Sequence, residues 1–83
     1  MFKAEIEKKL KEMAVKDVPF IVSFAPPEFG DYSTNLALVL AKKDKRNPME
    51  VAEETIAVIK KGKKFSKLFS EIKALVPGFI NFS

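Results

Sequence analysis

The spacing of apolar residues near the N-terminus predicts an amphipathic helix. Apolar side chains recur there at spacings of four, four and three, at Phe2, Ile6, Leu10 and Met13. This spacing places them in one stripe along a helix, while lysines and glutamates fill the other face. We therefore expect a helix over residues 2–16, with its apolar stripe against a core.

Two further helices are predicted in the middle of the chain. Asp31 or Ser33 can cap the first of them, and its centre, residues 36–41, is apolar on every side, which favours burial. The second is marked by Asn47 as the cap and by Pro48 in the first turn. It is expected to end near Gly62, so it spans residues 48–61.

Alternating apolar and other residues predict three strands. The first spans residues 18–24, where Val18, Phe20, Val22 and Phe24 share one face. The other two, residues 71–76 and 79–83, flank Pro77-Gly78 and predict a hairpin. The prolines at 26 and 27 predict a loop over residues 25–30. Residues 63–70 fit either a short helical turn or an irregular connection.

The order helix, strand, helix, helix, strand, strand predicts an α+β fold. Helices are expected to cover one face of a small, mainly antiparallel sheet in a two-layer sandwich. The other face is left for solvent or a partner. At 83 residues, the chain is expected to form a single domain over residues 1–83.

The amino-acid composition excludes several classes of function and supports few. The chain has no His and no Cys, so the commonest general base and the thiolate metal sites are excluded. No phosphate-binding glycine loop and no paired metal ligands occur, so we expect no catalytic site, no metal and no cofactor in this chain. No apolar run approaches a membrane span of about 20 residues, and no signal-peptide core is present, so a cytoplasmic location is expected. The net charge of +4 permits a nucleic-acid partner.

The C-terminal hairpin offers the best candidate for ligand contact. Residues two apart on a strand share a face, so Phe79 and Asn81 point away from Ile80 and Phe82. If Ile80 and Phe82 pack under the helices, an aromatic ring and an amide stand together on the open face, where they can stack on a base and bond its edge. Alternatively, Phe79 belongs to the core and Asn81 satisfies a neighbouring loop, and the usual burial of Phe favours that alternative.

Two other groups of residues have a structural and a binding interpretation. Four lysines can follow an RNA backbone, or they can form a solvated surface that complements a helix dipole. They are Lys60, Lys61, Lys63 and Lys64. In the string Phe-Gly-Asp-Tyr-Ser-Thr-Asn at residues 29–35, Tyr32 and Asn35 can contact a ligand or support a demanding turn. The residues alone favour the turn.

Together, and in this order, the string at residues 29–35 and Pro-Gly-Phe-Ile-Asn-Phe at residues 77–82 resemble the N-terminal additional domain of arginyl-tRNA synthetases. The resemblance covers nearly the whole chain. In that family the domain precedes the catalytic domain and contacts the D-loop of tRNA through its Pro-Gly-aromatic-x-Asn-Phe segment. Carried across, these contacts fall on Phe79 and Asn81, which favours the open-face interpretation. Some members have Tyr at the position of Phe79, so any hydrogen bond from a hydroxyl there is in doubt.

The resemblance implies a tRNA-binding accessory domain of a longer enzyme. It would recognise the D-loop region of arginine tRNA and position it for ATP-dependent aminoacylation elsewhere. The catalytic signatures of class I synthetases are absent from the chain, so ATP would bind a catalytic domain outside it. The alternative is a protein–protein docking module that packs on the parent synthetase without base readout. The polarity of Ser23, Lys73, Asn81 and Ser83 favours RNA over such docking.

Overall fold

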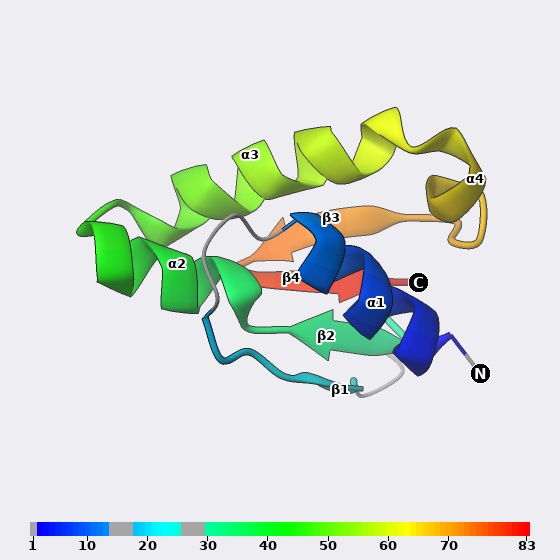
Figure 1. Ribbon diagram of the computed structural model, residues 1–83, viewed down its shortest axis with the longest axis horizontal. Helices are drawn as coiled ribbons and strands as arrows, with labels where there is room; N and C mark the ends of the chain where they lie inside the picture. Colours follow the sequence, from blue (N-terminus) through cyan, green and yellow to red (C-terminus); the bar gives the residue numbers. More distant parts are fainter. Residues whose placement is uncertain (1, 14–17, 26–29) are drawn as a thin grey trace.

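The computed structural model describes residues 2–13, 18–25 and 30–83, which form a layer of helices on a four-stranded sheet (Figure 1). The elements in chain order are α1 (Lys3–Met13), β1 (Val22–Phe24), β2 (Tyr32–Thr34), α2 (Leu36–Asp44), α3 (Pro48–Lys61), α4 (Lys63–Ser66), β3 (Ile72–Leu75) and β4 (Phe79–Phe82). The predicted α+β class is confirmed, and the predicted elements occur in the predicted order. The structure adds β2 to them, and for residues 63–70 it selects the short helical turn, as α4.

The sheet has the strand order β1-β2-β4-β3, and every neighbouring pair is antiparallel. β4 therefore lies between β2 and β3, although β2 is far from it in sequence. β3 and β4 form the predicted hairpin, with Lys73 opposite Asn81 and Leu75 opposite Phe79. On the other side of β4, Asn81 lies opposite Ser33.

The core lies between the helices and one face of the sheet. α1 contributes Ile6 and Leu10, which are both fully buried as the apolar stripe predicts. From β4, Ile80 and Phe82 are also 0% exposed, so the hairpin presents this pair to the helices. An aromatic group surrounds Phe82, with the Phe69 ring centroid at 5.1 Å. The prediction that Ile80 and Phe82 pack under the helices is therefore confirmed.

The start of α2 differs from the prediction. Residues 32–34 form β2 instead of a first helical turn, and Asn35 occupies the cap position without a side-chain cap bond. The proposal that Asp31 or Ser33 caps the helix is wrong, because this segment pairs with β1 on one side and β4 on the other. Thr34 replaces the cap: its hydroxyl donates to the Ile21 carbonyl at 2.8 Å and accepts from the Leu36 N–H at 3.3 Å.

Other predicted elements are shorter than expected. The first strand covers only Val22–Phe24 of the predicted residues 18–24. Phe24, predicted on the apolar face, is 71% exposed, because β1 is the edge of the sheet. Val76, predicted on the face of Ile72, is in the turn and is exposed. The predicted end of the first helix falls in residues 14–17, which lie outside the described residues. The same holds for residues 26–29 of the predicted double-proline loop.

The two ends of α3 form as the sequence predicts. The Asn47 side chain accepts hydrogen bonds from the N–H groups of Met49 at 2.9 Å and Glu50 at 3.2 Å, Pro48 occupies the first turn, and Gly62 is the C-cap. These bonds satisfy two of the donors that a helix start leaves without intrahelical partners. α3 runs along the sheet, so its ends fix where the hairpin and α4 lie.

Replacing Asn47 by alanine is expected to lower the free energy of unfolding by about 1 kcal/mol, because two N–H groups lose their acceptor. Urea denaturation followed by circular dichroism measures this change. The Asn47→Asp variant keeps an acceptor oxygen and serves as the control. Equal stability of the alanine and aspartate variants would contradict the capping role.

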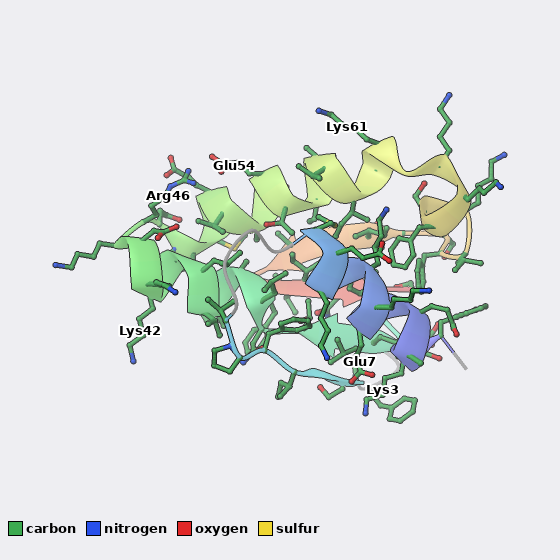
Figure 2. All side chains as sticks on the ribbon, in the orientation of Figure 1. Lys3, Glu7, Lys42, Arg46, Glu54 and Lys61 are labelled. Carbon is green, nitrogen blue, oxygen red and sulfur yellow. The ribbon has the colours of Figure 1, made fainter. Side chains whose placement is uncertain are left out.

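An ion pair joins the end of α2 to α3. The Arg46 guanidinium donates two hydrogen bonds to the Glu54 carboxylate, one of them at 2.8 Å (Figure 2). The hydrogen bond from Arg46 lowers the pKa of the Glu54 carboxyl. A lowered folded-state pKa means that the pair stabilises the domain above the ordinary carboxyl pKa and loses this contribution as the pH falls through the lowered value. Both side chains are exposed, so the contribution is small.

Candidate nucleic-acid interface

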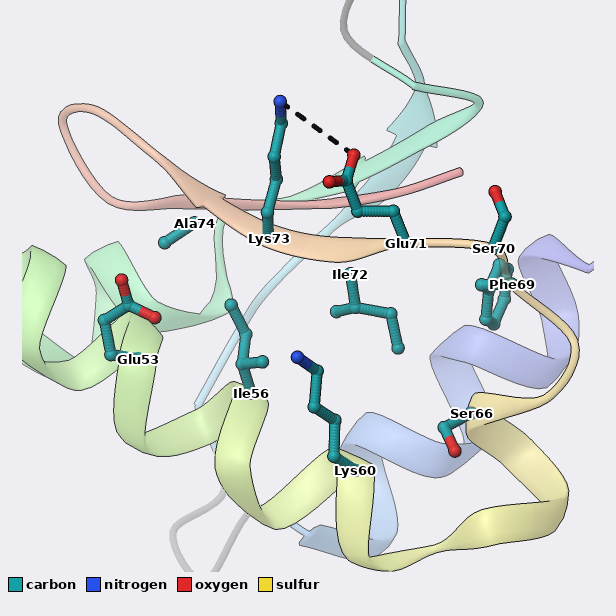
Figure 3. Close-up of a pocket in the computed structure, with 10 residues that line it drawn as sticks. All are labelled: Glu53, Ile56, Lys60, Ser66, Phe69, Ser70, Glu71, Ile72, Lys73 and Ala74. Carbon is teal, nitrogen blue, oxygen red and sulfur yellow. Dashed lines mark ion pairs between the residues drawn. The ribbon is translucent and has the colours of Figure 1, made fainter.

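Polar side chains form one row across the sheet. Strand register places Ser23 opposite Ser33, Ser33 opposite Asn81, and Asn81 opposite Lys73. Because side chains alternate along a strand, the row points away from the buried Ile80 and Phe82. Figure 3 shows Lys73 on the side of β3 that faces away from α3. The structure thus assembles, on the open face, three of the four polar residues that the sequence suggested.

Asn81 lies on this face but is only 3% exposed. Its Oδ1 atom accepts a hydrogen bond from the Ser33 hydroxyl at 2.9 Å. The amide is therefore held in one orientation by a neighbouring strand. The sequence predicted the face of Asn81 correctly, but it gave no signal for Ser33 as its partner.

Phe79 shares this face and is partly buried, opposite Leu75 on the paired strand. Its ring borders a hollow of about 240 Å³ in the open face. The residues that line this hollow are Ser23, Phe24, Ala25, Ser33, Leu75, Phe79 and Asn81. The Phe79 ring, Leu75 and small polar groups therefore lie around one concave site, which is the composition that suits a planar, unstacked base. The Phe24 ring packs on Tyr32, on the other face of the sheet. We call this site the sheet hollow.

The turn before Phe79 fixes the position of the ring. Gly78 has a φ of +155°, and a Cβ atom there would lie 2.6 Å from the Cβ of Pro48. The same atom would lie 3.2 Å from Cδ2 of Leu38. The turn therefore lies tightly against α2 and the start of α3, so Phe79 enters β4 from a fixed point. Only glycine allows this approach.

Tyr32 and Asn35 both have structural partners. The Tyr32 ring is 5% exposed and packs at 5.5 Å from the Phe24 ring, and its hydroxyl accepts from the Phe2 N–H at 3.1 Å. Asn35 accepts from the Ile21 N–H at 2.9 Å. Neither residue lines the sheet hollow. The Tyr32 bond joins β2 to the residue before α1, and the Asn35 bond joins the end of β2 to the residue before β1.

The predicted RNA-binding lysines lie elsewhere. Lys60 and Lys61 end α3, and Lys63 and Lys64 begin α4. α3 has 14 residues, so these lysines lie about 20 Å from the Pro48 end where the hairpin turn packs. The structure therefore does not bring them together with Phe79 and Asn81. Figure 1 shows α4 and the hairpin turn at opposite ends of the sheet.

A larger groove of about 580 Å³ lies between α3 and β3 (Figure 3). Lys60 and Ile56 project toward it from α3, and Ile72 faces them from β3. The groove also carries two carboxylates, Glu53 and Glu71. These carboxylates offset the charges of Lys60 and Lys73 in the same lining, so the groove has no excess positive charge to hold a phosphate chain, despite its size.

The described residues contain no cluster of three or more metal-ligating side chains. Within the same part of the chain, no helix is long and apolar enough to cross a bilayer.

Comparison with known proteins agrees with the sequence motifs. Residues 1–83 match the model of the family described as the arginyl tRNA synthetase N terminal domain. An arginine–tRNA ligase of Thermotoga maritima is 39% identical over 82 residues, which cover 93% of this chain and 14% of the relative. One from Alteromonas mediterranea is 40% identical over 73 residues, covering 87% and 12%. The aligned part of this chain therefore spans less than a sixth of the length of these relatives.

Proposed function

This chain belongs to the family of arginyl-tRNA synthetase N-terminal domains, and from that premise we propose that it is a tRNA-binding accessory domain. It recognises the D-loop region of arginine tRNA through the sheet hollow. It thereby positions the tRNA for ATP-dependent aminoacylation by a catalytic domain outside residues 1–83. Its place of action is the cytoplasm, and it needs no cofactor of its own.

The observation that carries this proposal is the position of Phe79 in the sheet hollow. A partly buried aromatic ring at the border of a concave site offers a stacking surface to any base that is turned out of its helix. Such stacking contributes about 1–3 kcal/mol per base. A contribution of this size is modest, which suits a domain that positions the tRNA and does not hold it without the rest of the enzyme.

Asn81 and Ser33 have a supporting role in this proposal. The Ser33 hydroxyl fixes the carbonyl side of the Asn81 amide at the floor of the hollow. Asn81 is 3% exposed, so a base that enters the hollow meets only the small accessible part of this held amide. Fixed polar groups discriminate between ligands better than mobile ones, because a mismatched ligand leaves them unpaired. Tyr32 and Asn35 act by holding β1 and β2 in place rather than by contacting RNA.

The Phe79→Ala variant is expected to bind arginine tRNA about 5- to 150-fold more weakly, which corresponds to the loss of one stacked base. Fluorescence titration of the 83-residue chain with the tRNA transcript measures the dissociation constant. Phe79→Tyr keeps the ring and is expected to keep the affinity. Val58→Ala, an exposed apolar position of α3, is the control on the helix layer.

Base readout is tested separately by NMR with an arginine-tRNA D-arm hairpin and a copy that carries a D-loop base substitution. Shifts centred on the amides of Phe79 and Asn81, and weaker with the substituted hairpin, would support recognition of that loop. If neither the shifts nor the affinity depended on Phe79, the proposal would fail.

The exposed apolar side chains near the hollow favour a second candidate. Phe24 is 71% exposed and Val76, next to Leu75, is 72% exposed. Phe24 lies on the helix side of the edge strand β1, against Tyr32, and Val76 lies in the hairpin turn, so these side chains suit docking of the β1 edge and the turn onto the rest of the synthetase. The docking candidate predicts that the D-arm hairpin causes no shifts at low salt, and that protection of Phe24 and Val76 from solvent appears only within the longer enzyme.

A further inference from the structure

We propose that the end of the domain formed by α3 and α4 is a second, separate contact surface for the phosphate backbone of the same tRNA. This inference rests on the proposed function. We call this surface the basic cap and define it by six lysines, which come from α1, α3, α4 and the segment after α4. They are Lys9, Lys60, Lys61, Lys63, Lys64 and Lys67.

The sequence supplies five of these lysines without an acidic residue among them. Residues 60–70 contain five lysines and no Asp or Glu, and all five side chains are exposed. The fold adds Lys9 from α1. Its Nζ atom lies 5.9 Å from the centroid of the Phe65 ring and close to Gly62, where a Cβ atom would be 3.0 Å away. The cap is therefore assembled by tertiary structure and not by one run of sequence.

The lysines of the cap are not neutralised by carboxylates of the described residues. The ion pairs in that part of the chain are Lys3–Glu7, Arg46–Glu54 and Lys73–Glu71. Helix dipoles account for Lys60 and Lys61 at the C-terminal end of α3. Lys63 and Lys64 lie in the single turn of the four-residue α4, which is both its first and its last turn, so no helix dipole argues for or against them there. The exposed lysines of the cap therefore leave this end of the domain positively charged, which suits an anionic partner.

The cap is too far from the sheet hollow to hold the same nucleotide. α3 separates them by about 20 Å, and the domain is 31 Å along its longest axis. Figure 2 shows Lys61 on the outer side of α3, beyond the groove that α3 forms with β3. An RNA that meets both surfaces must therefore contact the domain with different nucleotides at its two ends, which suits a tRNA. A base contact at one end and a backbone contact at the other would fix its orientation.

The two surfaces have different physical signatures. Each phosphate that a lysine neutralises releases counterions and adds about 0.7–0.9 to the slope of log Kd against log salt concentration. Stacking on Phe79 adds sequence dependence with little salt dependence. The cap therefore predicts affinity without base preference, and the hollow predicts base preference without strong salt dependence.

The test compares two triple variants of the 83-residue chain that lose the same charge. One is Lys61→Gln/Lys63→Gln/Lys64→Gln in the cap. The other is Lys42→Gln/Lys43→Gln/Lys45→Gln at the end of α2, which is the matched control. Dissociation constants for the arginine tRNA transcript are measured at several salt concentrations between 50 and 200 mM, with the D-loop base substitution alongside. Circular dichroism checks that both variants keep their helices.

We expect the cap variant to reduce the salt slope by about 2–3 and to weaken the normal and the substituted tRNA equally. The control variant should change the slope by less than 1. Equal slopes in the two triple variants would overturn the cap, because net charge alone would explain them. Phosphatidylserine vesicles provide the last check: if they bind as tightly as tRNA, and only through the cap, the assignment to RNA is wrong.

The failure of the cap and the failure of the proposed function can be distinguished. If Phe79→Ala weakens binding and the cap variant does not, the sheet hollow stands and the cap is overturned. If the cap variant flattens the salt slope while Phe79→Ala and the base substitution have no effect, the cap stands and D-loop readout is overturned.

Discussion

The Phe82→Ala variant is expected to lose about 3–5 kcal/mol of unfolding free energy, the range for removing a fully buried aromatic ring. Phe82 is 0% exposed and its ring packs against Phe69 and Phe65, with centroids at 5.1 and 6.3 Å. A domain of this size is stabilised by about 5–10 kcal/mol in total. The loss therefore removes a large share of its stability.

Urea denaturation monitored by circular dichroism measures the Phe82 effect, with Val76→Ala as the control. Val76 is 72% exposed, so its truncation should change the stability by less than about 0.5 kcal/mol. A Phe82 variant as stable as the Val76 variant would mean that the aromatic group is not the centre of the core. Peak dispersion in the NMR spectrum tells a weakened fold from an unfolded chain.

Adding a single methyl group at Gly78 is expected to cost about 2–4 kcal/mol. The backbone there has a φ of +155°, which residues other than glycine rarely adopt. In addition, the new Cβ would lie 2.6 Å from the Cβ of Pro48, so the turn must move away from α3. We expect Gly78→Ala to weaken tRNA binding as well, because the turn sets the position of Phe79.

Gly62→Ala is the matched control for Gly78. Its φ of −84° suits any residue, and the nearest atom to the added methyl group is the mobile Nζ of Lys9 at 3.0 Å. Stability should change by less than about 1 kcal/mol. Thermal unfolding of both variants, with tRNA titration of each, gives the comparison. Similar melting temperatures for the two variants would show that the hairpin turn has room to shift.

The elements that were predicted correctly are defined by residues that lie close together in the sequence. α3 has a cap at Asn47, a proline in its first turn and Gly62 at its end, so one window of sequence defines it. β2 was missed because its three residues, Tyr32–Thr34, are typical of a helix start and its partners come from distant segments. β2 pairs with β4 through residues about 48 positions apart, and a pattern within one short stretch of sequence does not predict such a pairing.

The candidate site was predictable to the same extent. Alternation along β4 predicted that Phe79 and Asn81 turn away from the core pair, and the sheet confirms this. The alternative that Asn81 satisfies a neighbouring segment anticipated its buried hydrogen bond, but not its partner, because Ser33 belongs to the unrecognised strand. The distance between the lysines and the hairpin follows from the length and direction of α3 relative to the sheet, which spacing in the sequence does not fix.

The strand order has a consequence for how the domain is made. In the described part of the chain, β4 is the last strand in sequence, yet it pairs with both β2 and β3. A growing polypeptide can form its helices early, but it cannot close the sheet until Phe82 has left the ribosome. The domain is therefore expected to fold in one late step during translation, and ribosomes that stall before residue 79 should carry a nascent chain that proteases cleave readily.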